Sequence, residues 1–190
     1  MLVGKKIILR LAEKADVSQL QQWLNDVKFA GDYQNFPVQT SYAQLEKRVT
    51  EQKNYENEWV DFIIEKKDGT RIGWATHYIS APNFGWTEIG FAIIPNARNR
   101  GYGTEAAKIL VDYLFLTREI VRIQAVVDAR NAASRLVVEK AGFRKEGTLR
   151  SSLWNANGEW ADGHIYSILR EDWEEPKILA KHFKRGLRRK

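Results

Sequence analysis

A strand, a glycine loop and the start of a helix follow one another in residues 93–107, and this order constrains the fold more than any other feature. The apolar strand ends at Pro95, a loop rich in Arg and Gly follows, and an Ala-rich helix is expected from about Thr104. The first turn of a helix leaves backbone N–H groups without intrahelical partners, and the helix dipole adds positive potential there. Gly101 and Gly103 carry no Cβ, so the backbone can approach a phosphate closely. This stretch therefore predicts an anion-binding loop.

The residue composition limits the class of protein. A chain of 190 residues suits one domain with a sizeable core. It contains no Cys, and His77, His164 and His182 lie far apart, so no metal site is expected. No apolar run approaches the roughly 20 residues of a membrane helix, and the apolar segment after Lys6 is too short for a signal peptide. We therefore expect a cytoplasmic protein without a membrane partner.

The net charge of +6 is concentrated at one end of the chain. Residues 177–190 hold seven Lys and Arg side chains and no acids, whereas the rest of the chain holds 23 basic and 24 acidic residues. We interpret the chain as one domain over residues 1–176 followed by a basic tail over residues 177–190. The tail is either a solubilising end or a weak contact for ribosomal RNA or another acidic surface.

Alternation and helical spacing divide the chain into short elements. Asp16 and Gln19 have the spacing of a capping box at the start of a helix, Asp68-Gly69 predicts a hairpin turn, and Gly142 is expected to end a helix. The expected strands cover residues 7–11, 59–65, 71–80, 86–94, 120–127, 143–153 and 161–169. The expected helices cover about residues 16–26, 42–54, 104–117, 131–142 and 171–183. This order predicts an α/β (α+β) fold whose sheet is antiparallel early and parallel around the glycine loop.

Three stretches together resemble a known family. The glycine loop reads Arg98-x-x-Gly-x-Gly, the segment from Asn131 reads Asn-x-x-Ser and ends in Gly-Phe, and a late strand ends in Tyr-Ser-Ile-Leu-Arg170. With the opening Ile-Leu-Arg strand, they resemble the GNAT superfamily of acetyl-CoA-dependent N-acetyltransferases. Within it, the chain is most similar to the RimJ/RimL branch of ribosomal-protein N-terminal acetyltransferases. The resemblance covers nearly the whole chain and implies a mixed seven-stranded sheet flanked by helices, with splayed strands at the coenzyme site.

The resemblance also implies that acetyl-CoA is the co-substrate and that no metal takes part. The loop amides would hold the pyrophosphate, and the exposed strand backbone before the loop would pair with the pantetheine arm. A backbone N–H there could also polarise the thioester carbonyl, as an oxyanion donor does. The residues expected to bind the coenzyme are Ile93, Ile94, Arg98, Asn99, Arg100, Gly101, Tyr102, Gly103, Thr104, Asn131 and Ser134.

Glu88 is the candidate general base. Most substrate amines are protonated at neutral pH, so a base must remove a proton, directly or through water. Glu88 lies within an expected strand, where a charged side chain requires an explanation. Gly90 and Ala92 share its face by alternation and would leave space above the carboxylate. The structural alternative is a Glu on the solvent face of a half-exposed sheet.

Asn131 and Ser134 are expected at the start of one helix. Asn131 suits an N-cap, and the resemblance adds a contact with the coenzyme arm. Ser134 lies one turn further on the same side and is the candidate catalytic acid for the departing thiolate, by resemblance. Many relatives have a Tyr where this chain has Val138, so a tyrosine acid at this position is excluded. Water, or no dedicated acid, are alternatives, and Ser134 could also serve only in packing.

Aromatic side chains are numerous, and most are expected in the core or on the sheet. Tyr33 and Phe36, in a long loop, are candidates for the acceptor slot. Asp162 and His164 alternate with Tyr166 on one strand face, either as acceptor-side groups or in structural hydrogen bonds.

The chain is thus interpreted as an N-acetyltransferase in which a primary amine attacks the thioester directly in a ternary complex. The acceptor expected from the resemblance is a protein N-terminal α-amine. The alternatives are a small amine, such as a polyamine, an antibiotic or an amino acid, and a non-catalytic coenzyme A sensor. A homodimer is a further hypothesis.

Overall fold

The computed structural model describes residues 1–26, 39–51, 59–81, 86–155 and 158–179. An eight-stranded mixed sheet forms its centre, in the order β1-β2-β3-β4-β5-β6-β8-β7. The strands are β1 (Leu2–Val3), β2 (Ile7–Leu11), β3 (Trp59–Lys66), β4 (Arg71–Ala81), β5 (Trp86–Ile93), β6 (Arg122–Asp128), β7 (Arg144–Trp154) and β8 (Trp160–Leu169). Among these strands, β5 and β6 are parallel and every other neighbouring pair is antiparallel.

One strand more than expected is present, because β1 pairs with β2 at the edge of the sheet. The chain reverses between them in a tight turn, in which the Gly4 N–H donates to the Ile7 carbonyl at 2.9 Å. Gly is required there, since a Cβ at this position would lie 2.3 Å from Oε1 of Glu105. The expected number of seven strands was therefore wrong by this short edge strand.

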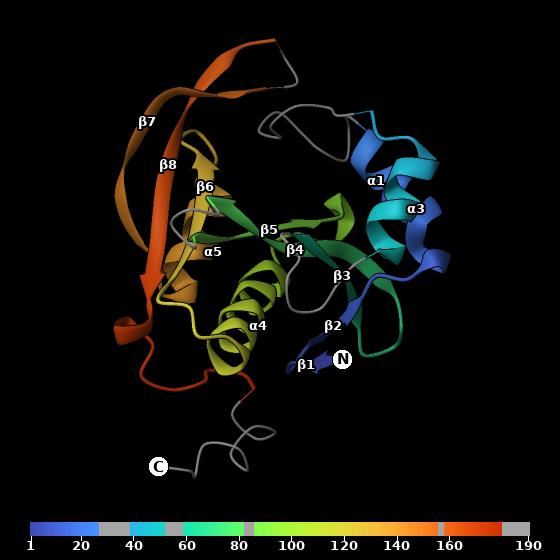
Figure 1. Ribbon diagram of the computed structural model, residues 1–190, viewed down its shortest axis with the longest axis horizontal. Coiled ribbons are helices and arrows are strands. Elements are labelled where there is room, and N and C mark those ends of the chain that lie inside the picture. Colours follow the sequence, from blue (N-terminus) through green and yellow to red (C-terminus); the bar gives the residue numbers. More distant parts are fainter. Residues whose placement is uncertain (27–38, 52–58, 82–85, 156–157, 180–190) are drawn as a thin grey trace.

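The helices lie on both faces of the sheet, with α1 and α3 at its β2–β3 end and the β7–β8 hairpin at the opposite end (Figure 1). They are α1 (Val17–Asn25), α3 (Tyr42–Thr50), α4 (Tyr102–Thr117) and α5 (Ala132–Ala141), with short 3-10 turns η1 (Lys14–Asp16), η3 (Pro95–Ala97) and η4 (Arg170–Asp172). Gly142 ends α5 in the left-handed conformation at φ 105°, as predicted.

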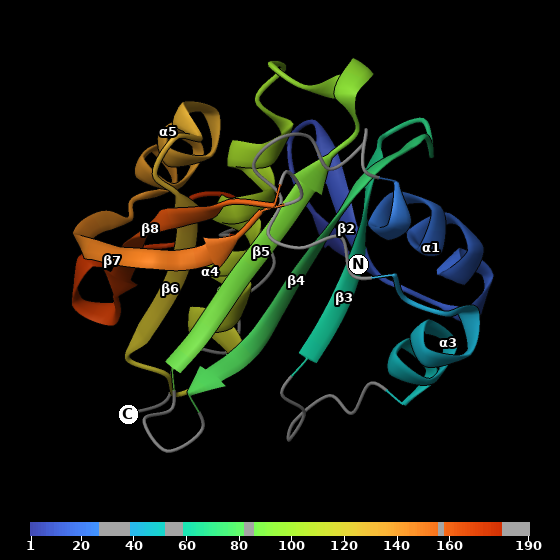
Figure 2. The same ribbon diagram turned by 90° about the horizontal axis from the view of Figure 1, so that it is seen from above.

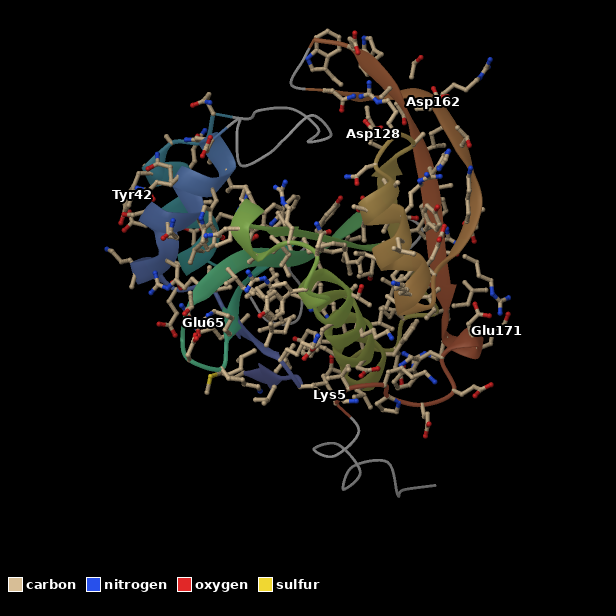
Figure 3. All side chains as sticks on the ribbon, turned by 180° about the vertical axis from the view of Figure 1, so that it is seen from behind. Lys5, Tyr42, Glu65, Asp128, Asp162 and Glu171 are labelled. Carbon is tan, nitrogen blue, oxygen red and sulfur yellow. The ribbon has the colours of Figure 1, made fainter. Side chains whose placement is uncertain are left out.

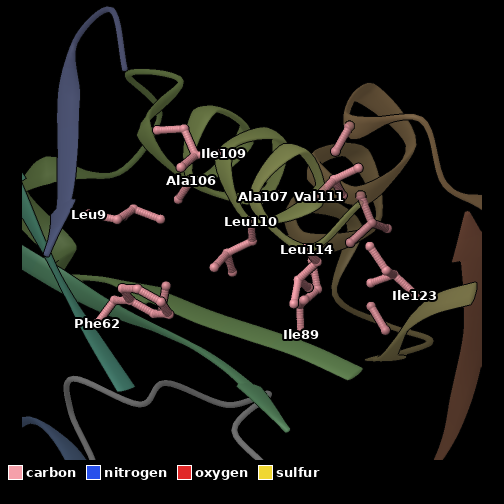
Figure 4. Packing of buried hydrophobic residues seen from close by; sticks show 14 of the residues in the cluster. Leu9, Phe62, Ile89, Ala106, Ala107, Ile109, Leu110, Val111, Leu114 and Ile123 are labelled. Carbon is pink, nitrogen blue, oxygen red and sulfur yellow. The ribbon is translucent and has the colours of Figure 1, made fainter. Parts of the chain in front are cut away.

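Two hydrophobic clusters use opposite faces of the same strands. Phe62 and Ile64 pack in the cluster built around α4 and α5, whereas Ile63 packs with α1 and α3. This follows from the two-residue period of a strand. The Ala-rich face of α4 presents Ala106 and Leu110 to the sheet (Figure 4), so this helix lies close over the centre of the core. The glycine loop at its start is thereby fixed relative to β5.

Two expectations about helix ends were wrong, because tertiary contacts outweigh local signals. Asp16 does not cap α1 with its side chain; it is buried in an ion pair with Arg10 at 2.6 Å. The helix expected over residues 171–183 is absent from the described residues, where η4 ends at Asp172 and the chain then runs over α4. Its backbone bonds to Asp112 instead, and buried Leu179 joins the core. The start of the expected tail thus packs onto the domain.

Several expectations fall outside the described residues. They are the loop of Tyr33 and Phe36, the end of the second helix after Glu51, the turn at residues 82–85, and the tail from residue 180 onward.

Candidate functional site

A fork between β5 and β6 is the main feature of the site. The two strands pair at two positions, Thr87 with Ile123 and Glu88 with Gln124. Beyond Glu88, β5 keeps its pairing with β4, and β6 keeps its pairing with β8. Figure 2 shows the two strands close at their first residues and separating toward their ends. The predicted splay of the strands is therefore confirmed.

The backbone N–H and C=O groups at the open end of the fork alternate between two directions, toward β4 and toward the gap. The Ile94 N–H donates to the Ile72 carbonyl at 2.9 Å, and the Ile94 carbonyl accepts from Ala97 at 3.0 Å. The expectation that Ile94 exposes free backbone groups was therefore wrong. Backbone groups alternate along an antiparallel pair, so those of Phe91 and Ile93 face away from β4, toward the gap. Consistent with this, the Ile93 carbonyl accepts a hydrogen bond from Nε of Arg98 at 3.0 Å.

The glycine loop joins this strand to α4. Asn99 and Gly101 have left-handed backbone conformations, with φ of 61° and 83°. Helix α4 begins at Tyr102, slightly earlier than expected, and its first turn lies at the exposed loop. Such a turn directs unpartnered backbone N–H groups outward, where they can bind an anion. The loop thus has the local geometry that its sequence predicted.

Lys6 is a cation beside this loop that sequence reasoning missed. Its Nζ donates to the carbonyl of Arg100 at 3.1 Å. Its backbone N–H donates to Oε1 of Glu105 at 2.8 Å, which ties the start of β2 to the first turn of α4. A lysine just before β2 has no local signal for this role, because the contact joins residues 94 positions apart.

Glu88 lies at the closed end of the fork, where its half-buried carboxylate is held by two neighbouring strands. Oε1 accepts from the Tyr78 hydroxyl at 2.6 Å, and Oε2 accepts from Nε2 of Gln124 at 2.9 Å. Burial raises the pKa of Tyr78, and the adjacent Glu88 charge raises it further, so the phenol remains a hydrogen-bond donor. Glu88 is therefore a fixed hydrogen-bond acceptor and not a freely solvated surface charge.

The space expected above Glu88 is partly filled. A Cβ at Gly90 would lie 3.2 Å from Cγ2 of Thr76 and 3.9 Å from the Trp74 ring. Gly90 thus accommodates side chains of β4, which occupy part of the space expected above Glu88. Tyr78 also stacks on Trp59, with ring centroids 4.4 Å apart and planes at 11°. An aromatic wall therefore stands beside the carboxylate.

Helix α5 begins next to the glycine loop. Oδ1 of Asn131 accepts from the Ser134 N–H at 2.9 Å, which confirms the predicted N-cap. One turn later, Val137 approaches the start of α4, where a Cβ at Gly103 would lie 3.6 Å from Val137 and 3.5 Å from the Phe91 ring. The structure therefore brings together the three elements that carry the predicted coenzyme residues.

Asp162, His164 and Tyr166 belong to a structural region of the sheet. Asp162 accepts from the Ser151 N–H at 2.9 Å, and the Tyr166 hydroxyl donates to Glu139 at 3.0 Å. These contacts favour the structural alternative for Asp162 and Tyr166.

A second carboxylate, Asp128, lies near Asp162 at the end of β6 (Figure 3). Burial acts to raise the pKa of Asp128, but hydrogen bonds from Arg130 and its charge outweigh burial and lower that pKa. Nδ2 of the buried Asn155 donates to Asp128 at 3.1 Å, so the turn before α5 is braced by the β7–β8 hairpin.

The residues of the fork and loop suit an acetyl-CoA molecule. The loop offers the first-turn N–H groups and the cationic side chains of Arg98 and Arg100, and the edge of β5 beyond Glu88 is not paired with β6. Among the described residues, no group of His, Cys, Asp and Glu side chains could hold a metal ion. None of the described helices is both long and apolar enough to span a membrane.

Comparison with known proteins identifies the family. The model of the acetyltransferase (GNAT) domain matches residues 6–144, which is most of the chain. The chain belongs to the GNAT acetyltransferase family. The family prediction is therefore confirmed.

A relative with a similar sequence is also named as an N-acetyltransferase. The uncharacterized N-acetyltransferase YnaD of Bacillus subtilis is 38% identical over 86 residues, which are 45% of this chain and 50% of YnaD. The chain thus spans about half the length of this relative.

Two solved structures show the same fold. The spermidine N-acetyltransferase of Vibrio cholerae, in complex with CoA and spermine, has a TM-score of 0.77 at 21% identity, with 88% of this chain and 97% of that chain covered. The ribosomal L7/L12 α-N-protein acetyltransferase RimL, in complex with coenzyme A, has a TM-score of 0.73 at 19% identity, with 88% and 96% covered. GNAT enzymes with different acceptors share this fold, so the fold does not select the acceptor.

Proposed function

We propose that this GNAT protein transfers an acetyl group from acetyl-CoA to a primary amine by direct attack while both substrates are bound. The observation that carries the proposal is the Glu88 carboxylate at the closed end of the fork, with both oxygens held by hydrogen bonds. A base in this position can remove the proton that most amines carry at neutral pH. The chain contains no Cys, so an acyl-cysteine intermediate is not available.

Acetyl-CoA supplies an activated acyl group and a thiolate leaving group. In the proposed reaction the amine nitrogen bonds to the acetyl carbon as the C–S bond breaks. Glu88 takes one proton from the ammonium form of the acceptor, directly or through one water. The nitrogen loses its second proton as the C–S bond breaks, and this proton reaches the thiolate through the Ser134 hydroxyl or a water, so that the hydroxyl is restored and coenzyme A leaves as the thiol. The Arg98–Thr104 loop would hold the pyrophosphate, with Asn131 beside the coenzyme arm. The backbone of Phe91 and Ile93, which faces the gap, would hold and orient the acyl donor.

The first acceptor class in this proposal is a protein N-terminal α-amine. It rests on the resemblance to the RimJ/RimL branch, and the fold likeness to RimL is compatible with it. A small amine is the second class, because the spermidine enzyme has the same fold. The Trp59–Tyr78 wall beside Glu88 does not choose between the two classes, because the rings stack on each other and Arg48 lies over the Trp59 ring.

A thiol-release assay tests the proposal. Acetyl-CoA is supplied with a panel of N-terminal peptides, polyamines, aminoglycosides and amino acids, and free coenzyme A is measured together with mass analysis of the acceptor. We expect acetylation of at least one member and a stoichiometry of one thiol for each acetylated amine. Tight acetyl-CoA binding without turnover on any acceptor would instead identify a coenzyme sensor.

The basic tail is proposed as a weak contact with ribosomal RNA, and homodimerisation as a separate property. Deleting residues 180–190 is the appropriate test of the tail, because Leu179 is buried and belongs to the domain. Reduced, salt-sensitive association of the shortened protein with ribosomes would support the contact. Unchanged association would indicate that the tail only makes the protein more soluble. A separate measurement, sedimentation equilibrium of the full chain, tests the proposed homodimer.

A further inference from the structure

Gln124 is a buried polar side chain at the closed end of the fork. The residue is 4% exposed, and its neighbours in β6, Ile123 and Ala125, are buried and apolar. It is the Cα partner of Glu88 in the last residue pair that joins β5 to β6. A buried amide in this position must find hydrogen-bond partners or lose stability. Its contacts therefore indicate what the residue does.

The two amide hydrogens of Gln124 bond to two different strands. Nε2 donates to Oε2 of Glu88 on β5 at 2.9 Å and to Oγ of Ser80 on β4 at 3.0 Å. From β6, this one side chain thus reaches across β5 to β4. With the Tyr78 hydroxyl on the other carboxylate oxygen, it fixes the Glu88 carboxylate from both sides.

The orientation of the Gln124 amide leaves one buried acceptor without a hydrogen bond among the described residues. Oε1 of Gln124 is buried and has no hydrogen-bond partner in the part of the chain that the structure describes. The reversed orientation would place Oε1 against the Glu88 carboxylate, with two acceptors facing each other. The side chain therefore leaves one acceptor unsatisfied in order to present its donors to Glu88 and Ser80.

We infer that Gln124 is a positioning residue for the reaction. It holds the Glu88 carboxylate in one orientation and ties β6 to β5 and β4 where the fork closes. This inference rests on the proposed role of Glu88 as the base. Gln124 itself takes no proton and acts through Glu88.

The test replaces the amide and measures turnover, coenzyme binding and stability separately. Gln124→Met keeps the length of the side chain and removes both donors. Gln124→Glu keeps the shape and replaces the donor with a second carboxylate, which gives a further variant if the Met protein folds poorly. The matched control is Ser167→Ala. Ser167 is the partner of Gln124 on β8 and is also buried, but its hydroxyl bonds to Glu146 and not to Glu88.

We expect both Gln124 variants to lower kcat by about tenfold or more, the effect of one lost hydrogen bond in the transition state. The KM for acetyl-CoA and the calorimetric affinity for coenzyme A should change by less than about twofold, which corresponds to less than one hydrogen bond. In a Glu88→Gln background the same Gln124→Met change should have little further effect, because residues that act through one another are not additive. Equal losses of kcat in both backgrounds, or an equal loss in Ser167→Ala, would overturn the inference.

A spectroscopic readout separates this inference from the proposed function. The side-chain amide signals of Gln124 are followed by NMR in the wild type, in Glu88→Ala and in Glu146→Gln. A large shift in Glu88→Ala alone supports the contact even if Glu88→Gln keeps full activity and the base assignment fails. Unchanged signals in Glu88→Ala would reject the positioning role, whatever the activity.

Discussion

Oε2 of Glu88 and Nε2 of Gln124 lie 2.9 Å apart at the last residue pair that joins β5 to β6. The residue that closes the fork therefore also holds the carboxylate proposed as the base. A change in the separation of β5 and β6 at this point would therefore also shift the Glu88 carboxylate.

Replacement of the Glu88 carboxylate gives the most direct prediction for catalysis. Glu88→Gln keeps the shape of the side chain but cannot accept the amine proton, so kcat should fall by roughly 10²- to 10⁴-fold. Coenzyme A affinity, measured by calorimetry, should change little, because the predicted coenzyme contacts lie at the loop and beyond Glu88 on β5. Steady-state rates across pH 6–9 with the best acceptor provide the measurement.

The matched control for this variant is Glu146→Gln. Glu146 is another hydrogen-bonded carboxylate on the sheet, but its partners are Arg122 and Ser167. Its replacement should leave kcat within about twofold, less than the effect of one hydrogen bond. Full activity of Glu88→Gln throughout the pH range would refute the base assignment.

The glycine loop offers a prediction that separates backbone strain from binding. Gly101 has φ of 83°, and a Cβ there would meet Nζ of Lys6 at 3.5 Å, which is ordinary contact. Gly101→Ala should therefore act through the left-handed backbone and cost about 1–2 kcal/mol. Because the loop is the proposed pyrophosphate site, we also expect coenzyme A to bind roughly tenfold more weakly.

Gly69→Ala is the control, since Gly69 has the same φ of 83° in the β3–β4 turn, and a Cβ there would meet nothing within 4 Å among the described residues. Urea unfolding should show similar losses of stability in both variants, whereas calorimetry should show weaker coenzyme binding in Gly101→Ala alone. Equal coenzyme affinity in the two variants would argue against the loop as the binding site.

The sequence predicts the site better at its loop than at its fork. The positions of Gly101 and Asn131 follow from local rules for turns and helix caps, and both were placed correctly. The sequence signal for Gln124 is a polar residue between the apolar residues Ile123 and Ala125 of β6. The contact of Tyr78 with Glu88 depends on the register of β4 and β5, which shifts between Ile79 and Ala81. No local pattern reveals such a shift, because it is set by pairing between strands.

The end of the domain was predicted least well, for a physical reason. The segment 171–183 has helical spacing, but Pro176 lacks an N–H and disfavours helix in the residue before it. The carboxylate of Asp112, fully buried on α4, then accepts the N–H groups of residues 177, 178 and 179. Three backbone bonds to one buried charge outweigh a weak helical propensity.

Asp112 is therefore predicted to anchor the C-terminal segment. Besides the three backbone groups, it accepts from the Trp173 indole at 3.0 Å. Asp112→Asn keeps one acceptor oxygen and turns an amide toward the remaining donors, so the free energy of unfolding should fall by roughly 3 kcal/mol. Trypsin should also cleave faster after Lys177, because its following backbone is no longer held.

Urea unfolding and timed proteolysis measure these two effects. Asp172→Asn, in the same segment, is the control, since Asp172 accepts one backbone N–H, from Leu169, and pairs with Arg144. It should lose less stability and leave cleavage after Lys177 nearly unchanged. A loss in Asp112→Asn no larger than in the control would contradict the anchoring role.

His77 should make the stability of the fold depend on pH. It packs between Phe62 and Tyr113, each with ring centroids 6.0 Å away, and burial lowers its pKa to about 3, with a smaller contribution from the Arg118 charge. The unfolded chain binds a proton at His77 below its ordinary pKa of 6.5, whereas the folded chain does not until about pH 3. The contribution of His77 to stability is therefore complete above pH 6.5 and falls as the pH decreases through this window, by up to about 1.4 kcal/mol per pH unit.

In His77→Phe this dependence is lost, so the difference in unfolding free energy between wild type and variant should shift by about 2 kcal/mol between pH 6.5 and pH 5. Urea unfolding of both proteins at several pH values measures the shift, and the comparison cancels the contributions of other titrating groups. A difference that stays constant with pH would show that folding does not change the pKa of His77.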